Sequence, residues 1–545
     1  MFVSLNWLKE YVDLKDLSVD QVAEALTDAG LEVEGIKPLS GVDDNVVVGK
    51  VLSAEKHPDA DKLQVCTVDV GESEPLTIVC GAPNARAGIH AVVAKVGAVL
   101  PGDFKIKKSK IRGQPSFGMM CSEQELELSE SHDGIIELPG EPQVGARVKE
   151  VLQLDDTVIE LSITPNRADC NGYVGIARDL AAKLGRSLTL PSPNPKTAAG
   201  LDTEAQVKVA IEGENTCGRF VALAIDDVKT IPSPRWMASR LQAAGMRSKN
   251  LIVDVTNYVM LEYCQPIHAY DKRDIRDNKI VVRKAKVGES MTTLDGQQRE
   301  LSPDDIMICD GQGPVGVAGV MGGANSEVKE DTSGLVVEVA HFSPVSVRRT
   351  SKRMGLHTEA SHRFERGIDI EAIPQVALRV GELLQQCTET YNKESSDQVP
   401  VPKVSAKMVD VYPIPFSRRK IAVRLTRAKN LLGLTRLTMD EISGALESLG
   451  LELLDSNAER MVFEIPTARL DLEREVDLIE EIGRMIGYDK IPYQLPHMHI
   501  KPVPEDPFLD FIENAKSEFA SQGFHEAMSF PFQNDAVPKL FRLPD

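Results

Sequence analysis

The distribution of hydrophobic and polar positions changes along the chain. Between residues 41 and 150, short runs rich in β-branched residues, such as VVVGKV and LTIVC, alternate with Gly, Pro and Asp. Short strands separated by regular turn signals predict a small β-barrel. On either side, residues 1–40 and 151–190 are mixed, and the apolar spacing in 18–30, after Ser18 as N-cap, predicts a helix. We therefore predict a barrel inserted into a discontinuous N-terminal mixed α/β domain.

Two later regions have different patterns. Residues 200–398 alternate apolar strand-like runs, such as RFVALAIDDV and LVVEVAHF, with helical stretches, which predicts an α+β domain. Residues 403–500 open with a strand and then repeat helical signals, and Thr438 and Glu441 have the spacing of a helix-capping box. Proline-rich stretches separate these regions, and a further segment, 505–545, follows the last of them. The chain is thus predicted to be a multidomain α+β protein.

The composition is that of a globular protein. With 545 residues, the chain has room for three or four domains at about 150 residues each. Apolar residues make up 42% and charged residues 26%, which excludes a collagen-like or mostly disordered chain. No run approaches the roughly 18 apolar residues of a membrane span, and Lys9, Glu10 and Asp13 interrupt the apolar core that a secretory signal requires. Eight scattered cysteines without a CxxC pair indicate reduced thiols, so we expect a cytoplasmic protein with no membrane contact.

The net charge of −20, from 62 basic and 82 acidic residues, argues against binding of nucleic acid by the whole surface. A local exception is the basic strip, which we define as Lys105, Lys107, Lys108, Lys110 and Arg112. On a small barrel, such a strip is able to follow the phosphates of an RNA backbone. A lysine-rich edge that keeps a β-hairpin from aggregating would look the same, so charge alone leaves both interpretations open.

An acidic cluster marks one predicted helix near the end of the chain. At 100° per residue, Asp477, Glu480 and Glu481 share one face with Arg484, opposite an apolar stripe. Carboxylates so close repel one another unless water or a cation neutralises them, and Asp471 lies just upstream. An all-oxygen set suits Mg²⁺. The alternative is the solvated outer face of an ordinary amphipathic helix.

The 200–398 region contains polar and flexible residues in unusual settings. His268 follows a proline in a turn-like segment, and Glu338 interrupts an apolar strand. The segment VAGVMGG carries Gly319 and Gly322, which allow a ligand to approach the backbone closely. Taken singly, each of these has a purely structural interpretation. The sequence has no GxSxG elbow, HExxH motif or Walker loop, so conventional serine hydrolases, zinc proteases and NTPases find no support.

Taken in order, the motifs resemble the beta subunits of bacterial phenylalanyl-tRNA synthetases. The segments that carry the resemblance cover essentially the whole chain and are MFVSLNWLKEYV, HPDADKL, VCGAPN, VTNYV, QPIHAYD, GLHTEASHRFERGID and RLDLEREVDLIEEIGRMIGYDKIP. The resemblance implies a tRNA-binding OB-fold barrel, an α+β editing domain, a helix-turn-helix-like Mg²⁺-binding module and, from residue 505, the start of a catalytic-like α/β domain. It also implies a tetramer of two alpha and two beta subunits, in which alpha binds ATP and activates phenylalanine.

For the beta subunit itself, the family implies binding of tRNA-Phe and hydrolytic editing of tyrosine attached to it. A pocket shaped for phenylalanine cannot strongly reject an analogue with one extra hydroxyl, so a second site has to read that hydroxyl. By position, Glu338 matches the residue that reads the hydroxyl, with a positioned water as nucleophile. The family's editing-pocket residues correspond here to Thr256, Asn257, His268, Gly319, Gly322 and Glu338. Its ligands for one Mg²⁺ per beta subunit correspond to Asp471, Asp477, Glu480 and Glu481.

The chain departs from the family pattern at two positions near His268. Cys264 and Tyr270 stand where the family commonly has Gly and Phe, which implies altered pocket dimensions. Family members also continue beyond residue 545, and 510–532 resembles the opening of their catalytic-like domain, so we expect a chain without the anticodon-binding domain. Two other functions stay open, a non-catalytic tRNA-binding or assembly scaffold and a freestanding trans-editing hydrolase that needs no alpha subunit.

Overall fold

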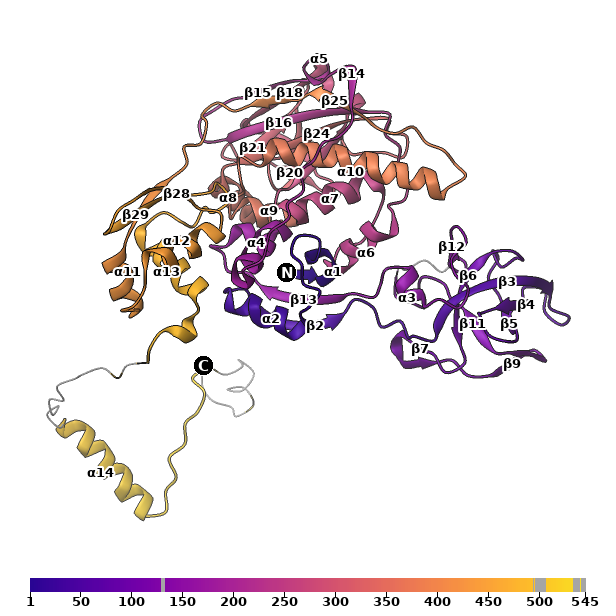
Figure 1. Ribbon diagram of the computed structural model, residues 1–545, viewed down its shortest axis with the longest axis horizontal. Helices are drawn as coiled ribbons and strands as arrows, with labels where there is room; N and C mark the ends of the chain where they lie inside the picture. The colour runs from indigo at the N-terminus through magenta and orange to yellow at the C-terminus, as the bar shows by residue number, and fades with distance from the viewer. Residues whose placement is uncertain (129–132, 494, 496–505, 533–539, 541–545) are drawn as a thin grey trace. The chain divides into compact units, whose positions relative to one another are not determined.

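The chain separates into two units after Ile491 (Figure 1). The computed structural model describes residues 1–128, 133–493, 495, 506–532 and 540. All of the predicted site residues lie in the first unit, Met1–Ile491. Within the described ranges, no helix combines the length and the apolarity that crossing a membrane requires.

A three-stranded antiparallel sheet joins segments from before and after the barrel, in the order β1-β13-β2. The elements of this part are β1 (Phe2–Ser4), α1 (Leu5–Leu8), α2 (Val19–Asp28), β2 (Glu32–Pro38), β13 (Thr157–Ser162) and α4 (Tyr173–Leu184). Helix α2 begins where the sequence indicates, because the Ser18 side chain accepts a hydrogen bond from the N–H of Gln21. Val22 and Leu26 of α2 are buried, and α2 packs on α4. A single sheet thus spans the insertion between β2 and β13.

The inserted region folds into a curled sheet of order β11-β6-β3-β4-β5, with β12 also on β6. Its elements are β3 (Val46–Lys56), β4 (Gln64–Asp69), β5 (Leu76–Cys80), β6 (His90–Lys95), β7 (Val99–Leu100), β8 (Phe104–Lys105), β9 (Ser109–Ile111), β10 (Gln114–Ser116), β11 (Gly118–Met120), β12 (Glu137–Leu138) and α3 (Val148–Val151). The N–H of Phe117 donates to the carbonyl of Thr77 at 2.8 Å and β11 contacts β5, so the sheet nearly closes on itself. The predicted barrel is confirmed.

Two sheets and several helices form the α+β region. The first sheet has the order β14-β25-β16-β24-β17, with β26 also on β16, and the second has the order β15-β18-β21-β22-β23. Helices α7 and α10 pack on each other, α10 also on β24 and α7 on β17 (Figure 1). The strands are β14 (Thr197–Asp202), β15 (Lys208–Ile211), β16 (Cys217–Asp226), β17 (Ile267–Asp271), β18 (Lys279–Lys284), β19 (Ser290–Thr292), β20 (Gln298–Glu300), β21 (Ile306–Cys309), β22 (Pro314–Val317), β23 (Met321–Gly322), β24 (Gly334–Phe342), β25 (Lys403–Lys407) and β26 (Val409–Val411). The helices are α5 (Thr203–Gln206), α6 (Arg235–Ala243), α7 (Leu251–Tyr263), α8 (Pro344–Met354), α9 (Glu359–Phe364) and α10 (Ile373–Glu394).

Two features of this region differ from the sequence-based expectation. Strands β25 and β26 pair with β16, so residues 403–411 complete this sheet, whereas the sequence placed 403 at the start of the next module. A strand pattern shows that a segment is extended but not which strand it pairs with. Helix α7 was not predicted, because most of its residues are buried and the apolar positions run almost all round it rather than along one stripe.

The segment from residue 420 forms a small sheet covered by helices. The sheet is antiparallel with the order β27-β29-β28, and helix α13 packs on α12 and on β27. The elements are β27 (Lys420–Arg424), α11 (Leu425–Leu432), α12 (Met439–Ser448), β28 (Glu452–Ser456), β29 (Arg460–Glu464) and α13 (Glu475–Ile486). The predicted capping box is confirmed, since Thr438 Oγ1 accepts from the N–H of Glu441 at 3.2 Å and Glu441 Oε2 accepts from the N–H of Thr438 at 2.8 Å.

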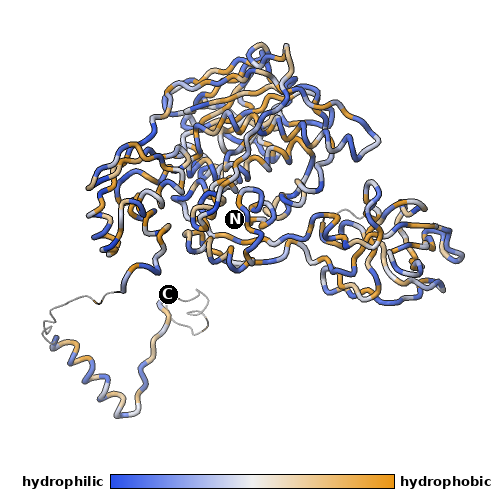
Figure 2. The backbone as a smooth tube through the Cα atoms, in the orientation of Figure 1, coloured by the Kyte–Doolittle hydropathy of each residue, from blue (hydrophilic) through white to orange (hydrophobic). Residues whose placement is uncertain are grey.

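In the second unit, the described residues include helix α14 (Pro507–Ser521). Figure 2 shows hydrophobic and hydrophilic residues alternating along this helix. The phenylalanines of α14 are exposed, with 66% of the surface of Phe508 and of Phe511 accessible. That 505–545 starts a catalytic-like domain stays a prediction, and part of that segment lies outside the described residues.

Candidate functional site

The pairing of β17 with β24 brings two distant ionisable residues face to face. In this antiparallel register His268 lies directly opposite Glu338, 70 positions later in the sequence. Side chains at directly opposed positions lie on the same face of a sheet, about 5 Å apart at their Cβ atoms. The two residues that the sequence singled out separately therefore form one site.

This site opens into a cavity of about 80 Å³. Of the six predicted editing-pocket residues, four line the cavity, namely His268, Gly319, Gly322 and Glu338. Gly322 is required by the close approach of His268, since a Cβ atom at this glycine would lie 2.6 Å from the imidazole Cε1. Gly319 has a φ of +68°, and a Cβ there would lie 2.9 Å from a methyl group of Val347. Both glycines thus shape the wall of the cavity.

Burial changes the protonation of both ionisable residues. Loss of solvent raises the pKa of Glu338 to about 7, although a hydrogen bond from Tyr270 acts in the opposite direction. Burial lowers the pKa of His268 to about 4, so the imidazole is neutral at physiological pH. Its Nε2 atom is buried and has no hydrogen-bond partner in the described part of the chain. An unpaired nitrogen at a cavity wall is available to a water or a ligand.

The other two predicted pocket residues do not line this cavity. Thr256 and Asn257 lie on α7, and the Thr256 hydroxyl donates a hydrogen bond to the carbonyl of Val253 within the same helix, at 2.7 Å. Helix α7 packs on β17, so these residues belong to the layer that supports His268. Their role in the site stays a prediction.

Tyr270 lines the same cavity and was not among the predicted site residues. Its hydroxyl donates a hydrogen bond of 2.5 Å to Oε2 of Glu338, and its ring lies edge-on to His268 with 4.4 Å between centroids. The sequence carried a signal for this residue, because alternate residues of a strand share a face and Tyr270 is two positions after His268. Tyr270, one of the two positions that depart from the family pattern, therefore lies inside the site.

The basic strip lies on the barrel surface, and all five of its residues are exposed. No acidic side chain forms an ion pair with them among the residues that the structure describes. Arg112 and Gly113, both with positive φ, form the two-residue turn between β9 and β10, and Arg112 stands at its tip. Lys105 and Lys107, together with Phe104, line a groove of about 710 Å³. The strip is thus free to meet an anionic partner.

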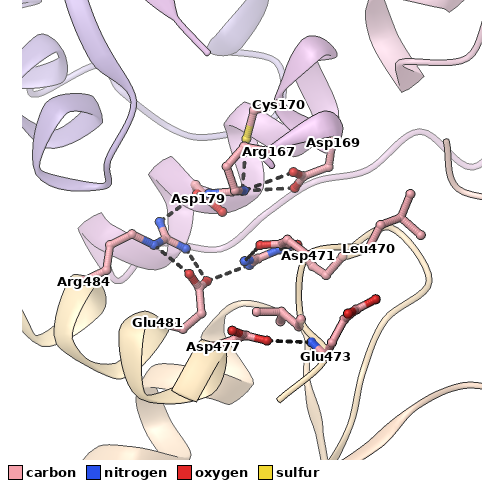
Figure 3. Close-up of polar contacts among 12 residues, drawn as sticks. Arg167, Asp169, Cys170, Asp179, Leu470, Asp471, Glu473, Asp477, Glu481 and Arg484 are labelled. Atoms are coloured by element: carbon pink, nitrogen blue, oxygen red, sulfur yellow. Dashed lines mark hydrogen bonds and ion pairs between the residues drawn. The ribbon is translucent and has the colours of Figure 1, made fainter. Parts of the chain in front are cut away.

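The predicted metal ligands lie in a different environment from the expected one (Figure 3). Both nitrogens of Arg469 that contact Asp471 lie within 2.9 Å of its carboxylate, and Arg469 Nη1 lies 2.6 Å from Oε2 of Glu481. Arg484 also binds Glu481. Burial alone would raise the pKa of Glu481, but the charges of Arg469 and Arg484 lower it to about 2. The positive guanidinium groups of two arginines therefore neutralise this carboxylate.

The remaining two carboxylates also have other roles. Asp477 accepts hydrogen bonds from the N–H groups of Glu473 and Arg474 at the start of α13, at 3.0 and 2.7 Å. Glu480 is exposed to solvent. Across the described ranges, no group of three or more His, Cys, Asp or Glu side chains is placed to hold a metal ion. In this arrangement the four residues do not fit a Mg²⁺ site. A solvated acidic face describes Glu480 but not Glu481, which is 4% exposed.

One arginine of this cluster, Arg484, also reaches the N-terminal part of the chain. Arg484 Nη1 lies 2.7 Å from Oδ2 of Asp179 on α4, and Arg167 Nη1 lies 2.6 Å from the same oxygen (Figure 3). Asp169 and Cys170 complete the contacts of Arg167. The cluster therefore joins α13 to α4 by buried ion pairs.

Comparison with known families matches each part separately. The B3/4 domain family matches residues 216–389, which include the cavity. A tRNA binding domain family matches 46–147, which include the basic strip, and the tRNA synthetase B5 domain family matches 421–488, which include α13.

Curated relatives match over nearly the whole chain. The phenylalanine–tRNA ligase beta subunit of Geobacter metallireducens is 43% identical over 537 residues, which are 98% of this chain and 65% of that protein. The phenylalanine–tRNA ligase beta subunit of Bacillus licheniformis is 40% identical over 550 residues, which are 100% of this chain and 66% of that protein. The chain thus spans about 65% of the length of these relatives.

Solved structures give a more distant likeness. An N-terminal fragment of the phenylalanyl-tRNA synthetase beta subunit from Pyrococcus horikoshii is 15% identical, with a TM-score of 0.32, covering 61% of this chain and 88% of that fragment. At this identity and TM-score, the structural likeness does not support a family relationship. The family relationship is supported by the three domain-family matches and by the identity to the curated relatives. On that evidence, this chain belongs to the family of phenylalanine–tRNA ligase beta subunits.

Proposed function

We propose that this chain acts as the beta subunit of a phenylalanine–tRNA ligase and that the cavity at His268 and Glu338 hydrolyses tyrosine attached to tRNA-Phe. The observation that supports the editing half is the directly opposed pair of His268 and the buried Glu338, beside two close-packed glycines. His268 itself is half-buried, but its Nε2 atom is buried and unpaired in the described part of the chain. Buried polar groups without partners are costly, and they are found where a ligand completes them.

The side chains around the cavity favour water as the nucleophile. None of the lining residues in the described part of the chain is a serine, threonine or cysteine. In the proposed step, a water oxygen attacks the ester carbonyl carbon, and the bond from that carbon to the tRNA ribose oxygen breaks. The water oxygen leaves with tyrosine, and the proton passes to the ribose oxygen. Neutral His268 orients the water or the ester through Nε2, and Glu338 accepts a hydrogen bond from the phenol of the substrate.

For the rest of the function, the basic strip binds the tRNA backbone and an alpha subunit supplies the synthetic site with ATP. In a chain with a net charge of −20, binding of an anionic RNA backbone needs such a focal basic contact. Co-purification with an alpha subunit, followed by an aminoacylation assay at the near-neutral pH of the cytoplasm, tests this half. Hydrolysis of Tyr-tRNA-Phe by the chain alone, without any affinity for alpha, would instead support a freestanding editing enzyme.

Magnesium at Asp471, Asp477, Glu480 and Glu481 stays a prediction from the family resemblance. No step proposed above passes through the metal, because arginines already pair with three of these carboxylates, Asp471, Asp477 and Glu481. Crystals of the assembly grown with Mn²⁺ give the test, since Mn²⁺ prefers the same oxygen ligands. An anomalous peak at these carboxylates would confirm the site, whereas unchanged arginine pairs without a peak would contradict it.

The editing half is tested by the Glu338→Ala variant of the assembled enzyme. Single-turnover hydrolysis of Tyr-tRNA-Phe should fall by about tenfold or more, since a hydrogen bond to a charged acceptor contributes about 1.5–3 kcal/mol. Hydrolysis unchanged by this variant would reject the role of Glu338. Glu371→Ala is a suitable control, because Glu371 also accepts a hydrogen bond from a tyrosine, Tyr412, but away from the cavity.

A second candidate, the non-catalytic scaffold, is favoured by one observation. The cavity of about 80 Å³ is smaller than the roughly 150 Å³ of a protein cavity that accepts benzene. If wild-type and Glu338 variants both leave Tyr-tRNA-Phe intact while the assembly still binds tRNA, the scaffold function is the correct one.

A further inference from the structure

The carboxylate that would read a substrate phenol already accepts a hydrogen bond from a phenol of the protein itself. The Tyr270 hydroxyl donates to Oε2 of Glu338 at 2.5 Å, and both side chains are nearly inaccessible, with 1% and 5% of their surfaces exposed. A phenolic hydroxyl is also the only chemical difference between tyrosine and phenylalanine. Tyr270 therefore presents to Glu338 the same group that the proposed site has to recognise.

The strand geometry fixes this contact. His268 and Tyr270 are alternate residues of β17 and share a face, and Glu338 of β24 lies directly opposite His268 and diagonally from Tyr270. The edge-on contact between the Tyr270 and His268 rings, at 72° between planes, holds the phenol in place. Because β17 pairs with β24 along its whole length, the phenol does not leave Glu338 without a change of rotamer or of the strand.

Few groups in the cavity are able to replace this interaction. Glu338, His268 and Tyr270 are the ionisable residues among those that line it in the described ranges. No side chain in the described part of the chain donates a hydrogen bond to the second oxygen, Oε1, so the Tyr270 bond is the one fixed interaction of the carboxylate. The ring of Tyr270 also occupies space in a cavity that is small for a second aromatic ring.

We propose that Tyr270 is a specificity-determining residue of this pocket, because its hydroxyl competes with the phenol of a tyrosyl ester for Glu338. This inference rests on the proposed editing function and deepens it. By occupying Oε2, Tyr270 lowers the advantage of a tyrosyl over a phenylalanyl ester, which has no hydroxyl to place there. The effect belongs to recognition and not to the bond-breaking step, so Tyr270 is a specificity residue rather than a catalytic one.

A purely structural role of Tyr270 makes a different prediction. If the hydroxyl only fixes the rotamer of Glu338, its removal should impair hydrolysis of both esters or of neither. If the hydroxyl competes with the substrate, its removal should favour the tyrosyl ester alone. The ratio of hydrolysis rates for Tyr-tRNA-Phe and Phe-tRNA-Phe separates the two roles, because effects on folding or on tRNA binding cancel in that ratio.

The experiment compares wild type, Tyr270→Phe, Glu338→Gln and the double variant in the assembled enzyme. Tyr270→Phe keeps the ring and removes only the hydroxyl, and it should raise the Tyr/Phe ratio about tenfold, the value of one hydrogen bond to a charged group. In the double variant this gain should disappear, because the acceptor is changed. Tyr412→Phe is the matched control, since it removes the same hydroxyl from a 2.7 Å bond to Glu371 elsewhere and should leave the ratio unchanged.

A pH profile gives an independent readout. The ionisable groups that face Glu338 are His268 and Tyr270 from β17 and Cys217 from β16, and Cys309 lies near Tyr270. The bond from Tyr270 favours the charged form of Glu338 and lowers its pKa. When the Tyr/Phe ratio of hydrolysis rates is plotted against pH, Tyr270→Phe should therefore move the midpoint of the curve to higher pH. Tyr412→Phe should not move it.

The outcomes separate this inference from the proposed function. If wild type hydrolyses the tyrosyl ester, Glu338→Gln weakens that activity and Tyr270→Phe leaves both ratio and midpoint unchanged, the inference is overturned and the editing function stands. Activity that appears only in Tyr270→Phe supports the inference in its strongest form, with Tyr270 closing the pocket. If neither wild type nor Tyr270→Phe hydrolyses either ester, the proposed editing function fails, and the inference fails with it.

Discussion

The guanidinium of Arg484 lies 2.7 Å from a carboxylate oxygen of Asp179, although 305 positions separate the two residues in the sequence. The same oxygen of Asp179 lies 2.6 Å from Arg167, so one carboxylate oxygen accepts from two arginines (Figure 3). The side chain of Asp179 is fully buried, and those of both arginines are 6% exposed. The helix that carries the acidic cluster is thereby fixed to α4 of the N-terminal domain.

Replacement of Asp179 by alanine should destabilise the protein strongly. The change leaves two arginines buried without their shared partner, and breaking a buried ion pair on one side costs about 3–5 kcal/mol. Urea unfolding of the full chain, followed by tryptophan fluorescence, measures the loss. Asp16→Ala is the control, since Asp16 also pairs with an arginine, Arg186, but its side chain is 69% exposed. Equal effects of the two variants would contradict a stabilising role of burial at Asp179.

The stability of the α+β region should depend on pH through two groups that act in opposite directions. The pKa of Glu338 is raised by burial from 4.5 to about 7, so its contribution is complete below pH 4.5 and is lost as pH rises to 7. The pKa of His268 is lowered by burial from 6.5 to about 4, so its contribution is complete above pH 6.5 and is lost as pH falls to 4. Between pH 4.5 and 6.5 the two slopes cancel.

In the Glu338→Gln variant, the pH dependence of stability that His268 contributes should become visible, because the opposing contribution of Glu338 is removed. In this variant the free energy of unfolding should fall by about 1.4 kcal/mol for each unit that the pH drops between 6.5 and 4.5, relative to wild type. Urea unfolding at several pH values measures the difference. A variant with the same pH dependence as wild type would show that Glu338 is not protonated in the folded protein at pH 5.5.

Gly322→Ala should damage the cavity directly. The added methyl group would lie 2.6 Å from Cε1 of His268, so the imidazole has to move, and overpacking of this kind costs about 1–3 kcal/mol. Hydrolysis of the tyrosyl ester should fall together with stability. Gly313→Ala is the control, because a Cβ atom at this position meets no atom within 4 Å. If Gly322→Ala hydrolyses the tyrosyl ester at the wild-type rate, the exact position of His268 does not matter for the reaction.

Replacement of Lys105, Lys107 and Lys110 by alanine should weaken tRNA binding in a salt-dependent way. Each lysine that neutralises a phosphate contributes about 0.7–0.9 to the slope of the logarithm of affinity against the logarithm of salt concentration. The triple variant should therefore lower the slope by about two. Three exposed lysines outside the barrel, Lys208, Lys279 and Lys420, provide the control and should leave the slope unchanged. An equal slope in both triple variants would indicate that the lysines of the basic strip protect a strand edge from aggregation and do not bind phosphates.

Local features of the fold were predictable from the sequence because they depend on neighbouring residues. The short β-branched runs and regular turn signals of 41–150 predicted the barrel, and the spacing of Thr438 and Glu441 predicted the start of α12. Helix α7 escaped prediction because burial on most sides removes the polar stripe that marks an amphipathic helix. The partners of β25 and β26 were missed because hydrogen bonds between strands join residues far apart in sequence.

For the candidate site, the sequence determined which side chains are available, and the tertiary structure decided what each one contacts. His268, Glu338, Gly319 and Gly322 were identified as residues of interest, but only the register of β17 against β24 makes them one cavity. The acidic cluster was visible as a pattern, and its arginine partners were not, because Asp179 and Arg484 meet only after the two domains pack. Electrostatic energy depends on distance in space and on burial, and neither quantity is a function of position along the chain.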